Sequence, residues 1–294
     1  MPEAEWLERA ETQAIFAALD GREGRTRAVG GIVRDTLMGR LRPESDIDMA
    51  TELLPVVVMQ RAKAAGIDAY PTGIEHGTVT LRLNTTTVEV TTLRRDVETD
   101  GRHAQVQFGT DWVEDAKRRD FTLNALYCGF DGSLFDPLNG AGDALNNRVC
   151  FIGNAAQRIA EDGLRVYRFF RFSASHGGEK LDAEGLAACQ EAADRLDHLS
   201  AERVGSEMLR ILGLHKIALT IAVMNEIGLL RLSRDELASV LRYEVLGGQD
   251  PAARLALISG GSVDTLQSAW RLSNTIADAA RNVRDAATLM AEDK

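Results

Sequence analysis

The chain has 294 residues, which at about 150 residues per domain predicts two domains, each able to bury a core without disulfides or structural metals. Hydrophobic residues make up 45% and charged residues 27% of the sequence, with only 6 prolines, which excludes collagenous, low-complexity and wholly disordered chains. The formal net charge of −10 argues, taken alone, against a nucleic-acid partner, because phosphate binding rests on a basic surface.

The sequence predicts a protein that neither spans a membrane nor is secreted. No apolar run approaches the roughly 18 residues needed to cross a bilayer. The first residues include Glu3, Glu5 and Glu8, where a signal peptide would be basic and then apolar. The 3 cysteines are far apart and lack metal-ligand spacing, which fits a reducing compartment. We therefore expect a cytoplasmic protein.

The first half of the chain has the patterns of a mixed α/β fold. In chain order they predict a helix over residues 10–20, an apolar strand over 27–33 broken by Gly30-Gly31, a helix over 34–38, a strand over 47–50 and a helix over 55–65. Residues 78–83 and 86–93 alternate between apolar and polar, which predicts an antiparallel pair. Asp131-Gly132 predicts a second hairpin, between 126–130 and 133–135.

From about residue 154 onward the pattern is helical. Apolar residues at helical spacing begin with Ile159, and further helices are predicted around 183–195, 201–213, 216–229, 234–246, 251–259 and 264–290. We find no strand pattern of comparable quality after residue 155. We therefore expect an α+β fold, with a mixed head over residues 1–150 and an all-helical body over 151–294.

Asp46-Ile47-Asp48 places two carboxylates two residues apart on a predicted strand, so that both leave the same face. An isolated pair of this kind is typical of the charged solvent face of an edge strand. Glu89 favours a second interpretation, because Val88 and Val90 face the core and turn Glu89 to the opposite face. Three carboxylates on one face form an all-oxygen site suited to two Mg²⁺ ions, with Mn²⁺ as an alternative.

Gly30-Gly31 ends an apolar strand and is followed at once by a predicted helix carrying Arg34. Either the two glycines form a tight turn only, or they let the backbone approach a phosphate at the N-terminus of the helix. The spacing is neither that of a Walker loop nor that of a Rossmann fingerprint.

Arginine is used far more than lysine: of 34 basic residues, only five are lysine. Bidentate contact with phosphates and base edges explains this bias, and so does a GC-rich genome. On the first helix of the body, Arg165, Arg168 and Arg171 recur every three residues, which gives a slowly winding stripe. The stripe is either a solvated face or a nucleotide-contacting one, and Glu161-Asp162 at its start favours the second interpretation.

These residues belong to a recognisable set of motifs. Residues 28–35 (AVGGIVRD) followed by Asp46-Ile47-Asp48 resemble the head of class II nucleotidyltransferases of the polymerase β superfamily. Residues 118–125 (RRDFTLNA), 161–165 (EDGLR) and 200–203 (SAER) match later blocks of the same family. The sequence is most similar to the CCA-adding tRNA nucleotidyltransferases, with the bacterial poly(A) polymerases next.

The resemblance implies an enzyme that adds C, C and A to the 3′ end of tRNA from CTP and ATP, releasing pyrophosphate without a nucleic-acid template. It implies that Asp46 and Asp48 bind the metals with help from Glu89. It also implies nucleotide-binding roles for a larger set: Gly31, Arg34, Arg119, Asp120, Asp162, Arg165, Arg168 and Arg171.

The implied roles of Asp162 and Arg165 have a physical reason. Cytosine and adenine both present an amino donor beside a ring-nitrogen acceptor, so one carboxylate and one guanidinium can pair with either base. Guanine and uracil would set a carbonyl against the carboxylate, a buried mismatch of about 1–3 kcal/mol.

Two segments bear on the choice within the family. Residues 94–103 are polar, typical of a surface loop, and in the family a loop here is linked to the change from adding C to adding A. Residues 72–79 (TGIEHGTV) resemble the CCA-adding enzymes, whereas poly(A) polymerases have an arginine-rich segment there. A poly(A) polymerase or a relative that adds only CC or only A remains the alternative. The resemblance fades after about residue 250, so either the helical tail is short or the sequence is truncated there.

Overall fold

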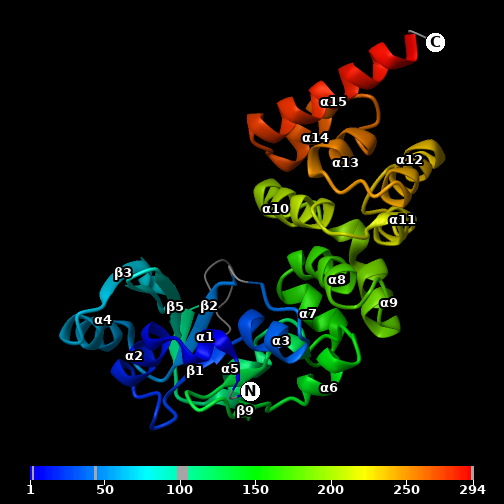
Figure 1. Ribbon diagram of the computed structural model, residues 1–294. Helices are drawn as coiled ribbons and strands as arrows, with labels where there is room; N and C mark the ends of the chain where they lie inside the picture. Colours follow the sequence, from blue (N-terminus) through cyan, green and yellow to red (C-terminus); the bar gives the residue numbers. More distant parts are fainter. Residues whose placement is uncertain (2, 43–44, 98–104, 293–294) are drawn as a thin grey trace. The chain divides into compact units, whose positions relative to one another are not determined.

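The computed structural model describes residues 1, 3–42, 45–97 and 105–292, and the chain divides into two compact units (Figure 1). The first unit contains residues 1–146 and 150–153, and the second contains residues 147–149 and 154–294. Among the residues described, no helix combines the length and apolar character that a membrane span requires.

The first unit is built on a seven-stranded sheet of order β3-β4-β5-β2-β1-β8-β9. Its strands are β1 (Thr26–Val29), β2 (Ile47–Thr51), β3 (Asp68–Gly73), β4 (Thr78–Leu83), β5 (Thr86–Thr92), β8 (Tyr127–Cys128) and β9 (Leu134–Phe135). All neighbours are antiparallel except β2 and β5, which run parallel. A separate antiparallel pair joins β6 (Arg94–Val97) and β7 (Gln105–Phe108). The mixed sheet expected for the head is therefore confirmed.

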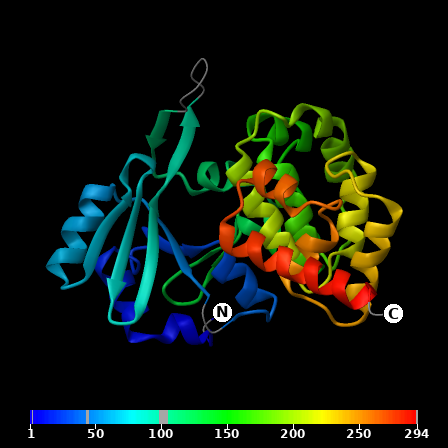
Figure 2. The same cartoon turned by 90° about the horizontal axis from the view of Figure 1, so that it is seen from above.

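Alternation of side chains decides which face of the sheet is buried. In β5, Val88 and Val90 are buried while Thr87 and Glu89 are exposed, as the sequence pattern predicts. Helices cover the unit: α1 (Glu5–Glu8), α2 (Ala10–Ala18), α3 (Gly31–Leu37), α4 (Pro55–Ala64), α5 (Trp112–Lys117) and α6 (Gly140–Leu145), with short 3₁₀ turns η1 (Ile74–His76) and η2 (Thr122–Asn124). Figure 2 shows α4 beside the outer strands of the sheet, where it packs on β3 and β4.

Several local expectations for this unit need correction. The strand expected over 27–33 ends at Val29 and α3 begins at Gly31, because Gly30 adopts φ 71°, a backbone conformation that turns the chain. Strand β3 was not expected; it contains Pro71 and lies at the edge of the sheet, where proline is tolerated. Strand β6 was not expected either, and it occupies the start of the segment expected as a loop. Residues 98–103 of that segment lie outside the described residues.

The second unit consists of helices: α7 (Ala155–Glu161), α8 (Leu164–Ser175), α9 (Ala183–Ala192), the 3₁₀ turn η3 (Ala193–Arg195), α10 (Ala201–Leu212), α11 (Ala218–Glu226), α12 (Arg234–Val245), α13 (Pro251–Leu257), α14 (Val263–Trp270) and α15 (Asn274–Glu292). The single helix expected over 264–290 is wrong. The chain turns at Arg271, whose φ of 49° is left-handed, and the Leu272 amide donates back to the Gln267 carbonyl at 3.0 Å.

Close approach of α10 and α14 depends on Gly205. A Cβ at this position would lie 2.1 Å from the Trp270 carbonyl oxygen, which belongs to the backbone and cannot rotate away. Gly213, at the C-terminus of α10, has an ordinary φ of −84°, and its nearest neighbour would be 3.5 Å away. The glycine inside α10 therefore cannot accept a side chain, whereas the glycine that ends the helix can.

We predict that Gly205→Ala lowers the free energy of unfolding of the second unit by at least about 2 kcal/mol, because the added methyl group forces α10 and α14 apart. Gly213→Ala is the matched control and should change stability by no more than about 0.5 kcal/mol. Chemical denaturation followed by circular dichroism measures both. Equal effects of the two substitutions would contradict the packing argument.

Candidate active site

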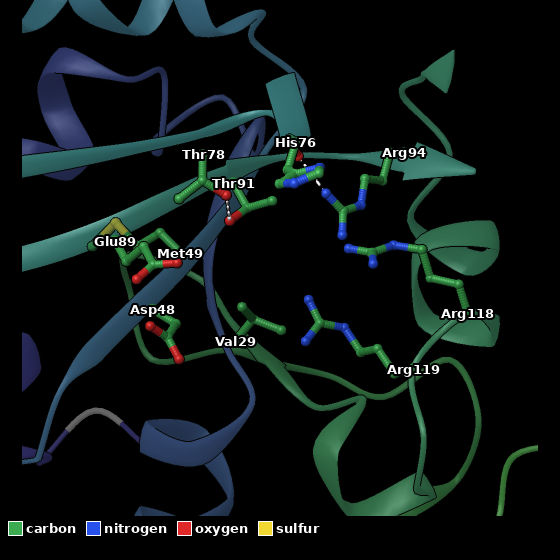
Figure 3. A pocket seen from close by; sticks show the side chains of 10 residues that line it. All are labelled: Val29, Asp48, Met49, His76, Thr78, Glu89, Thr91, Arg94, Arg118 and Arg119. Carbon is green, nitrogen blue, oxygen red and sulfur yellow. Dashed lines mark hydrogen bonds between the residues drawn. The ribbon is translucent and has the colours of Figure 1, made fainter. Parts of the chain in front are cut away.

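An acidic pair lies on the exposed face of the sheet, where β2 and β5 run side by side. Parallel pairing sets Asp48 directly opposite Glu89, and the neighbouring pairs Ile47–Val88 and Met49–Val90 turn inward. Asp48 and Glu89 both line a cavity of about 400 Å³ (Figure 3). Asp46 lies one residue before β2, is exposed and does not line this cavity.

The Asp48 carboxyl group is harder to ionise here than in water. Partial desolvation in the cavity and the adjacent Glu89 carboxylate raise the pKa of Asp48 to about 6; Asp46 adds to this effect and Arg119 opposes it. Water still reaches the Asp48 side chain, which is exposed at the cavity. The negative charges therefore repel each other here, and a bound proton or cation would reduce this repulsion.

The cavity has a basic side as well as an acidic one. Arg94, Arg118 and Arg119 line it together with His76, and Figure 3 shows these side chains, from β6, the residues that directly follow α5, and η1, around the same cavity as the acidic pair. The Arg94 guanidinium also donates to the His76 carbonyl oxygen. The remaining lining residues are Val29, Met49, Thr78 and Thr91. A ligand that carries both phosphate oxygens and a bound cation fits such a two-signed cavity.

The Gly30-Gly31 turn gathers several of the predicted nucleotide-binding residues. A Cβ on Gly30 would lie 3.8 Å from an Arg119 guanidinium nitrogen, and one on Gly31 would lie 3.8 Å from Arg34 Nη2. Arg34 is only 7% exposed; its Nη1 donates to Asn124 Oδ1 at 2.6 Å and its Nε to Asp35 Oδ1 at 2.7 Å. The start of α3 is therefore fixed close to the basic side of the cavity.

Asp120 has a supporting position in the same network. It is buried, and its Oδ1 accepts from the Phe121 amide at 2.8 Å and from Asn124 Nδ2 at 3.0 Å. Asn124 in turn accepts from Arg34, so Asp120 connects the motif at 118–125 to α3. Neither Asp120 nor Arg34 lines the cavity itself.

In the second unit, Asp162 ends α7 and lies just before α8. Its Oδ1 accepts from the Leu164 amide at 3.1 Å, and its Oδ2 accepts from Arg203 Nη2 at 2.8 Å. Arg165 is engaged elsewhere, because its Nη1 donates to Glu161 Oε2 at 2.7 Å and to the Arg158 carbonyl at 2.6 Å. The two predicted base-reading residues are thus close in sequence but are held by different partners.

Arg168 and Arg171 converge on one buried carboxylate that the sequence analysis did not single out. Glu207 of α10 is 4% exposed, and its oxygens lie 3.7 Å from Arg168 Nη1, 2.5 Å from Arg171 Nε and 3.4 Å from Arg210 Nη1. Burial lowers the pKa of Arg171, and the nearby Glu207 opposes that shift. The regular spacing of arginines on α8 gives no signal of a partner on another helix.

We predict that Asp48→Asn stabilises the protein at pH 8 in metal-free buffer by about 1 kcal/mol. This energy is smaller than the full pKa shift would give, because water at the site screens the charge. The folded protein holds the Asp48 proton more tightly than the unfolded chain, so the cost of the charge develops as the pH rises from 3.8 to about 6. The gain should therefore vanish below about pH 4. Thermal unfolding across this range measures it, with Asp68→Asn on the edge strand β3 as the control. A gain that does not depend on pH would contradict the assignment.

Two families match successive parts of the chain. Residues 26–150 match the family described as "Poly A polymerase head domain", and residues 180–240 match "Probable RNA and SrmB- binding site of polymerase A". The first range contains every residue that lines the cavity.

Relatives and solved structures agree with these matches. The chain is 47% identical over 190 residues to mitochondrial CCA tRNA nucleotidyltransferase 1 of Mus musculus, covering 63% of this chain and 43% of the relative. It is 37% identical over 223 residues to the CCA-adding enzyme of Geobacillus sp. (strain WCH70), covering 73% of this chain and 54% of the relative. It therefore spans about half the length of these curated relatives.

Among solved structures, the fold resembles that of the Bacillus stearothermophilus CCA-adding enzyme in complex with CTP. The TM-score is 0.80 at 29% sequence identity, and the match covers 95% of this chain and 71% of that chain. Together with the motifs and the mixed sheet, these similarities show that the chain belongs to the family of CCA-adding tRNA nucleotidyltransferases and bacterial poly(A) polymerases.

Proposed function

We propose that this chain is a nucleotidyltransferase that adds C, C and A to the 3′ end of tRNA, taking CTP and ATP and releasing pyrophosphate. The observation that carries the proposal is the cavity in which Asp48 and Glu89 face three arginines. Relatives named as CCA-adding enzymes support it. In this proposal the head, residues 1–150, performs the chemistry, and the body, residues 151–294, selects the nucleotide and contacts the tRNA. The cytoplasmic location expected from the sequence stays a prediction.

Membership of this family implies use of a divalent metal. Within the described residues, no three acidic, histidine or cysteine side chains converge on one point, but Asp48 and Glu89 give a pair of hard oxygen ligands suited to such an ion. We propose Mg²⁺, two ions, held by Asp48 and Glu89 with Asp46 beside them, and Mn²⁺ as a substitute. When bound, these ions would stabilise the negative charge of the reacting phosphates.

The reaction proposed is an in-line displacement at the α-phosphorus of the nucleotide. The terminal hydroxyl of the tRNA loses its proton to water and forms a bond to this phosphorus, the bond between the α-phosphorus and the bridging oxygen breaks, and pyrophosphate leaves. Arg118 and Arg119 are placed to bind the triphosphate, since guanidinium groups pair well with phosphate oxygens. Arg34 and Gly31, at the start of α3, would help to bind the triphosphate on the same side of the cavity.

Nucleotide selection is proposed to depend on Asp162 and Arg165. Arg168 and Arg171, on the same helix as Arg165, would support this selection, and Asp120 would support the nucleotide site in the head. Asp162 is held by Arg203, which keeps its carboxylate in place at the start of α8. A carboxylate and a guanidinium pair with the amino group and ring nitrogen of cytosine or adenine, and leave a mismatch with guanine and uracil.

We predict that a tRNA lacking CCA, incubated with CTP and ATP, gains three nucleotides and then stops, while GTP and UTP are refused. Single-turnover extension measures each step on sequencing gels, with one tRNA that lacks CCA, one that ends in the first C and one that ends in CC. A long A tail on any RNA with CTP ignored would instead identify a poly(A) polymerase.

Asp46→Ala should abolish incorporation, whereas tRNA binding should stay within about twofold of the wild type.

We also predict that Mg²⁺ or Mn²⁺ raises the melting temperature of the wild-type protein, because an ion that binds only the folded state stabilises it. In Glu89→Gln and Asp48→Asn this rise should be largely lost, since each substitution removes an ionised oxygen ligand. Differential scanning fluorimetry with and without a chelator measures the shift, and Asp68→Asn is the control. An unchanged metal response in both variants would place the metal site elsewhere.

A further inference from the structure

Asp115 is a buried carboxylate on α5 that the motifs and the cavity do not themselves include. It is 1% exposed, although it lies one helical turn before two arginines that line the cavity. Asp111 caps the start of α5, accepting from the Val113 amide at 2.8 Å and the Glu114 amide at 3.2 Å. The N-terminus of the helix that carries Asp115 is therefore fixed.

The two oxygens of Asp115 bind different arginines. Oδ1 accepts from Arg118 Nε at 2.8 Å, and Oδ2 accepts from Arg119 Nη2 at 3.2 Å. The Tyr127 hydroxyl donates to Oδ2 at 2.9 Å and accepts from Arg119 Nε at 3.2 Å. One carboxylate and one hydroxyl thus bind two guanidinium groups, and both arginines line the cavity (Figure 3).

The surroundings make this arrangement rigid. The Tyr127 ring is buried and meets Trp112 edge to face, with 5.4 Å between the ring centroids. Burial alone would raise the pKa of Asp115, but Arg119, Arg118 and the hydrogen bonds outweigh it, so the pKa lies below its usual range. Asp115 is therefore ionised at neutral pH, and one negative charge opposes two positive charges. Both arginines line the cavity that also contains Asp48 and Glu89.

We propose that Asp115, with Tyr127, is a positioning residue that fixes Arg118 and Arg119 to receive the triphosphate of the incoming nucleotide. This inference rests on the proposed function, because it assigns the arginines to the phosphates of the nucleotide. Free guanidinium groups on flexible side chains lose rotamer entropy when they bind, and holding them beforehand removes that loss. A bond to each arginine from a separate oxygen also fixes the spacing between the two groups.

The test measures binding of inorganic tripolyphosphate to the full chain by isothermal titration calorimetry, in metal-free buffer. We expect Asp115→Asn to weaken binding by roughly 10- to 100-fold, because displaced groups lose their alignment with the ligand. Tyr127→Phe should weaken it less and in the same direction, and it retains the carboxylate if the first variant fails to fold.

The matched control is Glu52→Gln, a carboxylate that directly follows β2 and contacts the same helix α5 at Trp112. Glu52 accepts from Trp112 Nε1 at 2.9 Å and pairs with Arg25 Nε at 3.3 Å, but it does not line the cavity. Its loss should lower the melting temperature and leave tripolyphosphate affinity within about twofold of the wild type. If Glu52→Gln weakened binding as much as Asp115→Asn, the effect would be a general loss of packing and the proposal would fail.

A double-mutant comparison separates positioning from a direct role. If Asp115 acts through the arginines, Asp115→Asn should weaken binding no further once Arg118 and Arg119 are both alanine. Additive losses, or wild-type affinity in folded Asp115→Asn and Tyr127→Phe, would overturn the proposal. Since binding of tripolyphosphate requires no turnover, a chain that bound it as predicted but extended no tRNA would refute the proposed function and leave the positioning role standing.

Discussion

The parallel pairing of β2 with β5 is the constraint on which the site depends. In the rest of the sheet neighbouring strands run antiparallel, but here the register sets Asp48 beside Glu89 on the exposed face while apolar neighbours fill the core. A shift of one residue in either strand would bury a carboxylate and expose a valine or a methionine, so the hydrophobic core fixes the spacing of the charges. The crowded negative charge is thus a consequence of packing on the opposite face.

Charge is organised locally in this molecule, and the whole-chain value describes it poorly. The net charge of −10 predicts a surface that repels phosphates, yet three arginines line the cavity opposite the acidic pair. Arginine suits such a cavity better than lysine, because one planar guanidinium group can donate some N–H groups to a carboxylate that holds it and others to a ligand. Electrostatic attraction at the site then depends on a few fixed side chains within several ångströms, where Coulomb interactions are strongest.

Buried acids hold arginines in both units. In the first unit, Asp115 binds Arg118 and Arg119; in the second, Glu207 lies within ion-pairing distance of Arg168 and Arg171. In each case one carboxylate binds several guanidinium groups, which satisfies the buried acid. Removal of either acid would leave guanidinium groups of like charge close together without their shared carboxylate. Each carboxylate therefore affects the positions of several arginines.

Local alternation and short motifs determined much of this protein. The pattern of residues 78–83 and 86–93 predicted the β4–β5 pair and placed Glu89 on the exposed face, because side chains in a strand alternate with a period of two. The motif residues predicted the family from the sequence itself. Gly30 predicted the turn before α3, although the strand and the helix meet earlier than expected.

Tertiary structure alone decided which charged groups meet. The pairing of Tyr127 with Asp115, and of Glu207 with the arginines of α8, joins residues 12 and 36 or more positions apart, and no local pattern encodes such contacts. The break at Arg271 has the same origin, since intrinsic preference disfavours a left-handed arginine and only packing around the end of α14 compensates for it. Periodicity reports which face of an element is buried, whereas the partner on that face is set by how distant elements pack.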